Sequence, residues 1–165
     1  MLYVNLFFIY SILGFVFEST LVKMVVKNYE SGIMFGFWTP VYGLGVLVII
    51  LIYKILEKHI NNKLLRGILL FFGSAIILSI LEFIGGVLIE NLFNKVFWNY
   101  SFYKYNLGKY ISLETAIIWG VFSILIIYLV NPLVKKIAKI IPKWLTYILI
   151  ILFIIDLVMT FVIKL

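Results

Sequence analysis

The hydrophobic run at residues 68–89 is the feature that most constrains how this chain can fold. It is as long as the roughly 20 apolar residues that a helix needs to cross a bilayer. One carboxylate, Glu82, stands past its middle, and an acid inside a spanning helix costs about 2.5 to 3.5 kcal/mol on insertion scales. The run therefore predicts a transmembrane helix that shields Glu82 from hydrocarbon.

Small residues accompany this carboxylate at helical spacing. Ser79 stands three residues before Glu82, and Gly85 and Gly86 stand three and four residues after it. Residues at these spacings share one face of a helix, and small side chains let a neighbouring helix approach closely. The pattern indicates that Glu82 faces protein rather than lipid.

Composition extends this expectation to the whole chain, which is 65% hydrophobic and 13% charged. Such values lie far outside the range of soluble globular domains, so we predict an integral membrane protein with a single polytopic domain over residues 1–165. The chain has no cysteine, which removes disulfides and thiolate ligands. It also has no phosphate-binding loop, so a nucleotide-driven step would need a partner chain.

The net charge of +7 does not indicate nucleic-acid binding. The basic residues stand mostly between the hydrophobic runs, where they act as topology signals and contacts for lipid headgroups. We therefore expect membrane lipid as a partner and no nucleic acid.

Five hydrophobic runs predict an all-α integral membrane protein with about five transmembrane helices. The other four runs are residues 1–26, 40–56, 113–130 and 145–163. The first has no basic start and no cleavage site of small residues, so we expect it to be retained rather than removed as a signal peptide. A polar break at residues 23–32 follows it.

The second predicted helix has a clear start. Thr39 fits an N-cap, and Pro40 fits the first helical position. Residues 32–38 would then form an irregular or re-entrant approach to this helix. Non-helical backbone at membrane depth persists only where protein or water covers it, so this segment is expected to line something.

Three further segments complete the predicted topology. Residues 57–66 form a polar connector, and residues 93–112 mix aromatic and polar side chains in a pattern typical of a loop at the membrane interface. Asn131 and Pro132 are expected to close the fourth helix. Residues 133–144 carry four lysines among aliphatic residues, which predicts a short amphipathic segment on an anionic membrane surface.

The basic residues favour one orientation. With five spans, the connectors on the N-terminal side hold the larger share of the 14 basic residues, namely Lys54, Lys58, Lys63, Arg66, Lys135, Lys136, Lys139 and Lys143. Cytoplasmic connectors are enriched in lysine and arginine. We therefore expect the N-terminus in the cytoplasm and the C-terminus outside.

The predicted topology places three carboxylates at similar depth. Glu18 shares a helix face with Ser11 and Gly14. At about 1.5 Å per residue, Glu18 and Glu82 both lie a little past the middle of spans that start on the same side. Glu114 lies in the first turn of a span that starts on the opposite side. We therefore hypothesise a carboxylate-lined cavity in that half of the membrane.

The candidate residues for substrate binding or proton exchange come from this half of the membrane. They are Glu18, Glu82, Glu114, Trp98, Tyr100, Asn99, Thr39 and Tyr42. No catalytic residue, metal or cofactor is assigned, because the chain lacks the common hydrolase and metal motifs and has a single histidine.

Structural interpretations of the same acids stay open. Glu18 and Glu82 could serve only as hydrogen-bonded residues in helix packing. Ser112 can cap the fourth helix, and an acid in the first turn, such as Glu114, favours the helix dipole. Asp156 in the last span has Thr160 one turn later as a partner, which leaves both packing and function open for it.

Several short motifs together resemble one family. They are Tyr10, Ser11, Leu13, Gly14 and Glu18; Gly32, Gly36, Pro40, Val41, Tyr42, Gly43 and Gly45; Leu81 and Glu82; Trp98, Tyr100 and Ser101; Asn106 and Gly108; and Trp119 and Gly120. In this combination the chain resembles the bacterial family of putative ABC-transporter type IV, CmpB-like membrane permeases. Asn99 departs from the family pattern, which commonly has an acid after the tryptophan. The resemblance implies a small polytopic protein of the bacterial cytoplasmic membrane.

The leading functional expectation is a permease-like or substrate-binding subunit of a transport system. Five spans are few for an independent transporter, so we expect a homo-oligomer or a separate ATPase or other partner subunit. One alternative is an intramembrane enzyme that acts on a lipid or lipid-linked substrate with a carboxylate as general base. Another is a non-catalytic assembly or regulatory subunit whose acids pair with a basic residue of another chain.

Overall fold

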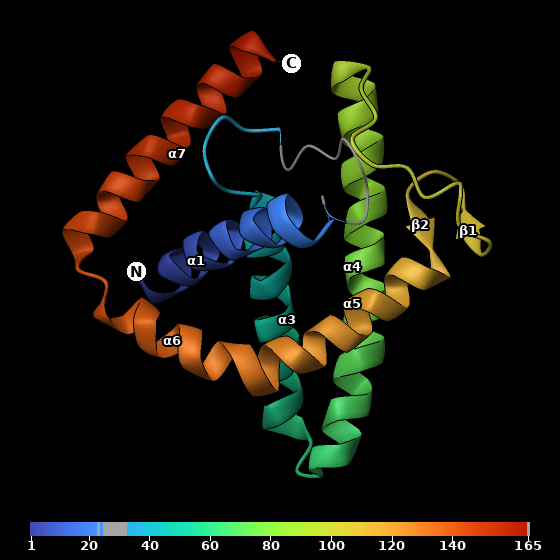
Figure 1. Cartoon of the computed structure of the whole chain (residues 1–165). Coiled ribbons are helices and arrows are strands. Elements are labelled where there is room, and N and C mark those ends of the chain that lie inside the picture. Colours follow the sequence, from blue (N-terminus) through green and yellow to red (C-terminus); the bar gives the residue numbers. More distant parts are fainter. Residues whose placement is uncertain (23, 25–32, 165) are drawn as a thin grey trace. The chain divides into compact units, whose positions relative to one another are not determined.

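The computed structural model describes residues 1–22, 24 and 33–164, and it is mostly helical (Figure 1). Its elements are α1 (Leu2–Phe17), η1 (Glu18–Val22), α3 (Pro40–His59), α4 (Lys63–Phe93), β1 (Asn106–Leu107), β2 (Ile111–Ser112), α5 (Leu113–Leu125), η2 (Ile126–Val130), α6 (Asn131–Ile140) and α7 (Lys143–Ile163). The turns η1 and η2 are π-helical continuations of α1 and α5. The predicted polar break at residues 23–32 lies outside the described residues except for Met24.

Five helical stretches in the described part of the chain are long and apolar enough to cross a membrane. They are Leu2–Thr20, Pro40–His59, Lys63–Phe93, Leu113–Ile140 and Lys143–Ile163. The predicted all-α fold with five spans is therefore confirmed, and the chain is a multi-pass membrane protein.

Contacts among the described residues group the chain into two compact units. One unit combines Met1–Leu47 with Asn131–Leu165, and the other is Val48–Val130. The division passes through α3 and through the junction of η2 with α6. The expected single polytopic domain stays a prediction.

In the first unit, α1 is tied to the C-terminal helices by a buried asparagine. Asn5 Nδ2 donates to the carbonyl oxygen of Ala138 on α6 at 2.9 Å, and Asn5 Oδ1 accepts from Thr146 Oγ1 on α7 at 2.7 Å. Within an apolar span each such polar group needs a partner. Asn5 therefore fixes how three helices of this unit meet.

The small-residue face of α1 receives the start of α3. A Cβ atom at Gly14 would collide with the Tyr42 ring, and one at Gly43 would collide with Ser11 Oγ. The backbone N–H of Thr39 donates to the carbonyl oxygen of Ser11 at 2.9 Å. This close approach explains why small residues stand at these positions.

Residues 33–39 form the predicted irregular approach to α3, which begins at Pro40 as expected. Within it, Met34 and Trp38 pack with Phe8 of α1 in an apolar cluster. Phe153 of α7 meets Trp38 edge to face, with ring centroids 5.7 Å apart. Helices α1 and α7 thus cover the irregular backbone.

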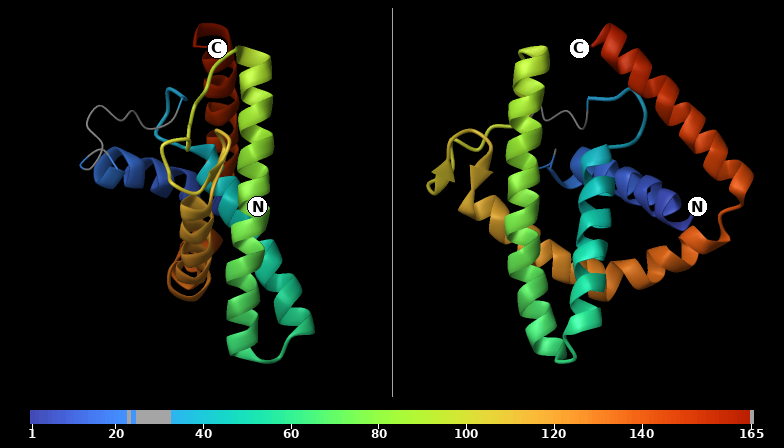
Figure 2. Two further views of the ribbon diagram at one scale, coloured as in Figure 1. Left: turned by 90° about the vertical axis from the view of Figure 1, so that its right-hand side faces the viewer. Right: turned by 180° about the vertical axis from the view of Figure 1, so that it is seen from behind.

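In the second unit, α5 packs across the long helix α4 (Figure 2). Gly120 allows this contact, because a Cβ atom there would lie 2.7 Å from the Phe71 ring. Before α5, the strands β1 and β2 form a short antiparallel hairpin in which Asn106 pairs with Ser112. The aromatic segment predicted as a loop therefore contains a small hairpin.

Two predicted boundaries are wrong. Asn131 and Pro132 do not close the fourth helix, because the helix continues through η2 to Ile140. A proline inside a regular α-helix clashes with the carbonyl four residues earlier, and the wider π-helical turn immediately before it changes that spacing. The polar connector is also shorter than predicted, since α3 runs to His59 and α4 starts at Lys63.

The amphipathic character predicted after the fourth helix is present in α6. Val134 and Ala138 are buried, whereas Lys135, Lys136 and Lys139 are exposed. The segment is a continuation of the fourth helix rather than a separate surface helix.

Candidate functional site

Glu82 on α4 meets the aromatic loop and α5. The Tyr100 hydroxyl donates to Glu82 Oε1 at 2.8 Å. The Trp119 side chain on α5 lies close to the same carboxylate. Sequence analysis placed Glu82 and Tyr100 among the candidates for one site, and the structure shows them in hydrogen-bond contact.

Three polar atoms around this contact are buried without a hydrogen-bond partner among the described residues. They are Glu82 Oε2, Ser79 Oγ and Trp98 Nε1. Ser79 lies one turn before Glu82, and the Trp98 ring lies over Gly85 one turn after it, 3.7 Å from an added Cβ. Buried polar groups are almost always hydrogen-bonded. Glu82 and Ser79 share a face of α4 with Gly85, which the Trp98 ring covers, so these groups can offer an acceptor, a hydroxyl and an N–H to a polar ligand.

The loop that carries Trp98 and Tyr100 is held against α4 by Lys109 and Tyr110, which we call the clamp. Tyr110 packs so closely on Gly86 that a Cβ atom there would collide with its ring. Its hydroxyl donates to Glu90 Oε2 at 2.7 Å, and Lys109 Nζ bonds Glu90 Oε1 at 2.5 Å. Burial and the hydrogen bond to Glu90 raise the pKa of Tyr110. The clamp holds Trp98 beside Tyr110, with ring centroids 5.9 Å apart.

Asn99 has a local role in this loop. Its side chain is exposed, and its Oδ1 accepts from the backbone N–H of Ser101 at 2.9 Å. This Asx-type turn shapes the backbone between Trp98 and Tyr100. The structure thus places Asn99 at the turn rather than against Glu82.

Glu114 has different partners from Glu82. Its Oε1 accepts from the backbone N–H of Tyr105 at 3.2 Å, while its Oε2 is buried without a partner among the described residues. Ser112 caps α5 by accepting from the backbone N–H of Thr115 at 3.0 Å, which confirms the predicted cap. Glu114 therefore joins the hairpin to the start of α5.

In the first unit, the structure pairs two further candidates. Glu18 is 8% exposed, and its Oε1 accepts from the Tyr42 hydroxyl at 3.0 Å. Thr39 is buried immediately before the start of α3, and its carbonyl oxygen accepts from the Tyr42 N–H at 3.1 Å. The convergence of Glu18 with Glu82 and Glu114 in one cavity stays a prediction.

Asp156 is the acid whose role sequence analysis left open. Its Oδ1 accepts from the backbone N–H of Phe35 at 2.9 Å, and its Oδ2 accepts from the backbone N–H of Gly36 at 2.7 Å and from Trp38 Nε1 at 2.6 Å. Thr160 donates a further bond at 3.2 Å. Asp156 on α7 therefore anchors the irregular segment that precedes α3.

The part of the chain that the structure describes contains no group of three or more histidine, cysteine, aspartate or glutamate residues placed to hold a metal ion. The polar atoms around Glu82 instead offer one carboxylate oxygen, one hydroxyl and one indole N–H. This set can bind a solute through hydrogen bonds and charge.

The fold and these buried carboxylates define a polytopic helical membrane protein with polar groups held inside its helix packing. The family described as Putative ABC-transporter type IV matches residues 5–163, and the chain belongs to this family. The match confirms the resemblance and places the chain among membrane transport proteins. No curated protein and no solved structure matches the chain.

Proposed function

We propose that this chain is a permease-like subunit of a transport system and that Glu82 contacts the transported solute or exchanges a proton with it. One observation carries the proposal. Glu82 Oε1 accepts a hydrogen bond from Tyr100, whereas Oε2 is buried and has no partner among the described residues, as is also true of Ser79 Oγ and Trp98 Nε1. An ionisable group inside a spanning helix is by default a candidate for function.

The chemistry of the surrounding groups indicates the class of solute. A carboxylate oxygen accepts from an ammonium or a hydroxyl group, and the Trp98 N–H can donate to a hydroxyl oxygen. The rings of Trp98, Tyr100 and Trp119 offer faces that attract cations and cover apolar carbon. A cationic or polyhydroxylated solute would use all of these groups.

The setting of the subunit follows from the family and from the sequence. An ABC-type transporter takes energy from an ATPase, and this sequence has no phosphate-binding loop. We therefore expect a separate ATPase subunit, a homo-oligomer or both, in the bacterial cytoplasmic membrane with the N-terminus in the cytoplasm.

The test uses membrane vesicles from cells in which the native copy is replaced by a variant, so that partner subunits stay present. Uptake of a panel of radiolabelled cationic and polyhydroxylated solutes is measured. Glu82→Gln keeps the shape of the side chain but removes its charge, and we expect uptake of the transported solute to fall at least about tenfold, the effect of about 1.4 kcal/mol.

Glu90→Gln is the matched control, because Glu90 lies on the same helix but binds Lys109 and Tyr110 with its two oxygens. This variant should retain most of the uptake. Equal uptake by the parent protein and by Glu82→Gln, at equal amounts in the membrane, would show that Glu82 has no part in transport. If Glu82→Gln instead lost a stoichiometric partner chain, the carboxylate would serve assembly.

A further inference from the structure

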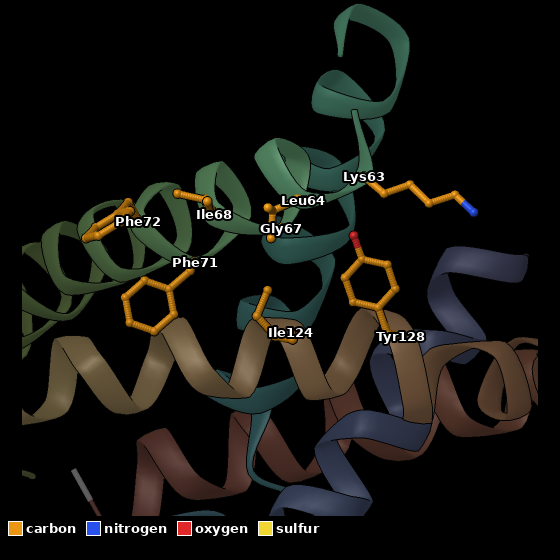
Figure 3. A pocket seen from close by; sticks show the side chains of 8 residues that line it. All are labelled: Lys63, Leu64, Gly67, Ile68, Phe71, Phe72, Ile124 and Tyr128. Carbon is orange, nitrogen blue, oxygen red and sulfur yellow. The ribbon is translucent and has the colours of Figure 1, made fainter. Parts of the chain in front are cut away.

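A groove runs between the start of α4 and the end of α5 with η2, and its volume is about 430 Å³. Figure 3 shows the side chains that line it. They are Lys63, Leu64, Gly67, Ile68, Phe71, Phe72, Ile124 and Tyr128. The groove shares none of these residues with the site at Glu82.

The body of the groove is apolar. Phe71 projects from α4 toward α5, while Ile124 and Tyr128 project back toward α4 (Figure 3). At Gly67 an added Cβ atom would meet nothing within 4 Å, so the groove is open there. Phe72 is 58% exposed. A spanning helix with such a surface contacts hydrocarbon chains.

A second apolar groove, of about 470 Å³, lies further along α4. It shares Phe71 and Phe72 with the first groove and continues to Ile80. A long flexible hydrocarbon chain could therefore lie along α4 beyond the first groove. A compact solute would not use this length.

The open end of the groove is basic and hydroxylated. Lys63 is the first residue of α4 and is exposed, and its side chain extends away from the apolar body (Figure 3). Neither Lys63 nor the Tyr128 hydroxyl makes an ion pair or hydrogen bond within the described ranges. Arg66, by contrast, forms an ion pair with Glu57 at 3.2 Å and donates a hydrogen bond to the Tyr53 hydroxyl at 3.3 Å.

We propose that this groove binds an anionic glycerophospholipid. The phosphate lies at Lys63 and the Tyr128 hydroxyl, and an acyl chain runs along Gly67 and Phe72. Lysines at the ends of spanning helices lie at the level of the lipid headgroups, so the cation and the apolar groove match the two parts of such a lipid. This goes beyond the proposed transport role and does not depend on it.

The experiment measures lipid binding to the full chain in detergent by native mass spectrometry. Phosphatidylglycerol and phosphatidylcholine with identical acyl chains are titrated separately. The parent protein should bind the first phosphatidylglycerol more tightly than phosphatidylcholine. Lys63→Ala should weaken phosphatidylglycerol binding about fivefold, the effect of one basic residue at an anionic lipid, and weaken phosphatidylcholine binding by a smaller factor, because the choline cation offsets the charge of the phosphate.

Lys58→Ala is the matched control, since Lys58 is an exposed basic residue near the end of α3 that does not line the groove. It should leave the lipid preference intact. Gly67→Leu tests the apolar part, because it fills the open space and favours helix. This variant should bind both lipids several-fold more weakly while its melting temperature is unchanged or higher.

Three outcomes would overturn the proposal. They are equal affinity of the parent protein for the two lipids, equal effects of Lys63→Ala and Lys58→Ala, and unchanged binding by Gly67→Leu. A competition experiment distinguishes binding of the whole lipid from binding of its headgroup alone. Glycerol 3-phosphate should not displace phosphatidylglycerol. Displacement at a similar concentration would mean that the groove serves a soluble phosphate and not a lipid.

Discussion

Glu82 and Asp156 are both acids in spanning helices, yet their surroundings differ. Asp156 accepts hydrogen bonds from Phe35, Gly36, Trp38 and Thr160. Glu82 leaves Oε2 without a partner among the described residues. The Asp156 carboxylate is satisfied by the fold, whereas the Glu82 carboxylate keeps one buried oxygen without a partner among the described residues. Asp156 therefore has a structural role, and Glu82 is kept as a candidate for binding because its open oxygen is combined with unsatisfied atoms of Ser79 and Trp98.

Asp156→Ala should destabilise the protein strongly. The substitution leaves two backbone N–H groups and the Trp38 indole N–H without their acceptor, and a hydrogen bond to a charged group is worth about 1.5 to 3 kcal/mol. We expect a loss of at least about 3 kcal/mol, measured by thermal unfolding in detergent. Thr160→Ala removes one of the bonds to the same carboxylate and should cost less, about 1.5 kcal/mol. Equal losses in the two variants would contradict the anchoring role of Asp156.

Tyr110 should make stability depend on pH in the alkaline range. Its pKa is raised by burial and by the Glu90 hydrogen bond, so the folded state favours the neutral phenol. This contribution is fully present below the unfolded pKa of about 10 and is lost as the pH rises through the folded pKa. The melting temperature of the parent protein should exceed that of Tyr110→Phe by a constant amount up to about pH 9, and the difference should shrink above about pH 10. If the difference in melting temperature stayed constant up to pH values well above 10, ionisation of Tyr110 would not contribute to the pH dependence of stability.

For individual residues, the sequence predicted some contacts and not others. Spacing of small residues pointed to the buried face of Glu82, and the aromatic loop supplied Tyr100 as a candidate. Helical spacing also gave Thr160 as a partner of Asp156, which the structure confirms. The other partners could not be found in this way, because two of these donors are the backbone N–H groups of Phe35 and Gly36. Every residue except proline has such a donor, so the sequence carries no signal for which ones are used.

Among the elements, α4 organises the second unit through its glycines. Gly86 receives the Tyr110 ring with no room for a Cβ atom, whereas an added Cβ at Gly85 would make ordinary contact with Trp98 at 3.7 Å. The two neighbours therefore have different roles. Gly86 permits the clamp, and Gly85 lies under the tryptophan of the candidate site.

Substitution of these glycines should have opposite effects. Gly86→Ala should displace Tyr110 and cost about 1 to 3 kcal/mol of stability. Gly85→Ala should be neutral or stabilising by up to about 1 kcal/mol, since alanine favours helix. Thermal unfolding measures both, and tryptophan fluorescence reports whether Trp98 has moved. If the two variants had the same stability, the packing of Tyr110 on Gly86 would not constrain the loop.

Element boundaries were harder to predict than the elements themselves. The start of α3 followed from Thr39 and Pro40, because capping chemistry is local. The end expected at Asn131 and Pro132 was wrong, because a π-helical turn at Ile126–Val130 lets the helix continue. Such turns leave no clear mark in composition or in hydrophobic period.

For the whole molecule, the orientation can be tested directly because the chain has no cysteine. Lys58→Cys and Lys104→Cys place single thiols at exposed positions before α4 and in the aromatic loop. A maleimide that cannot cross the membrane should label Lys104→Cys in intact cells and Lys58→Cys only after permeabilisation. The reverse pattern would invert the orientation, and labelling of both from one side would contradict the number of spans.

The sequence predicted the number of spans and the family because both depend on patterns along the chain. Whether Glu18 and Glu82 converge depends on how distant helices pack, and hydrophobicity cannot specify this when every helix is apolar on most sides. The pairs Glu18 with Tyr42 and Glu82 with Tyr100 come from the structure. The single-domain prediction stays a prediction.

The way α7 holds the segment before α3 has a consequence for how the chain can diverge. Asp156 binds the amide groups of Phe35 and Gly36, and Lys164 Nζ binds the carbonyl oxygen of Ile33 at 2.9 Å. Main-chain atoms are common to all residue types, so these hydrogen bonds do not depend on which side chains stand at Ile33 and Phe35. Gly36 is the exception, because a Cβ atom there would lie 2.7 Å from Asp156 Oδ2.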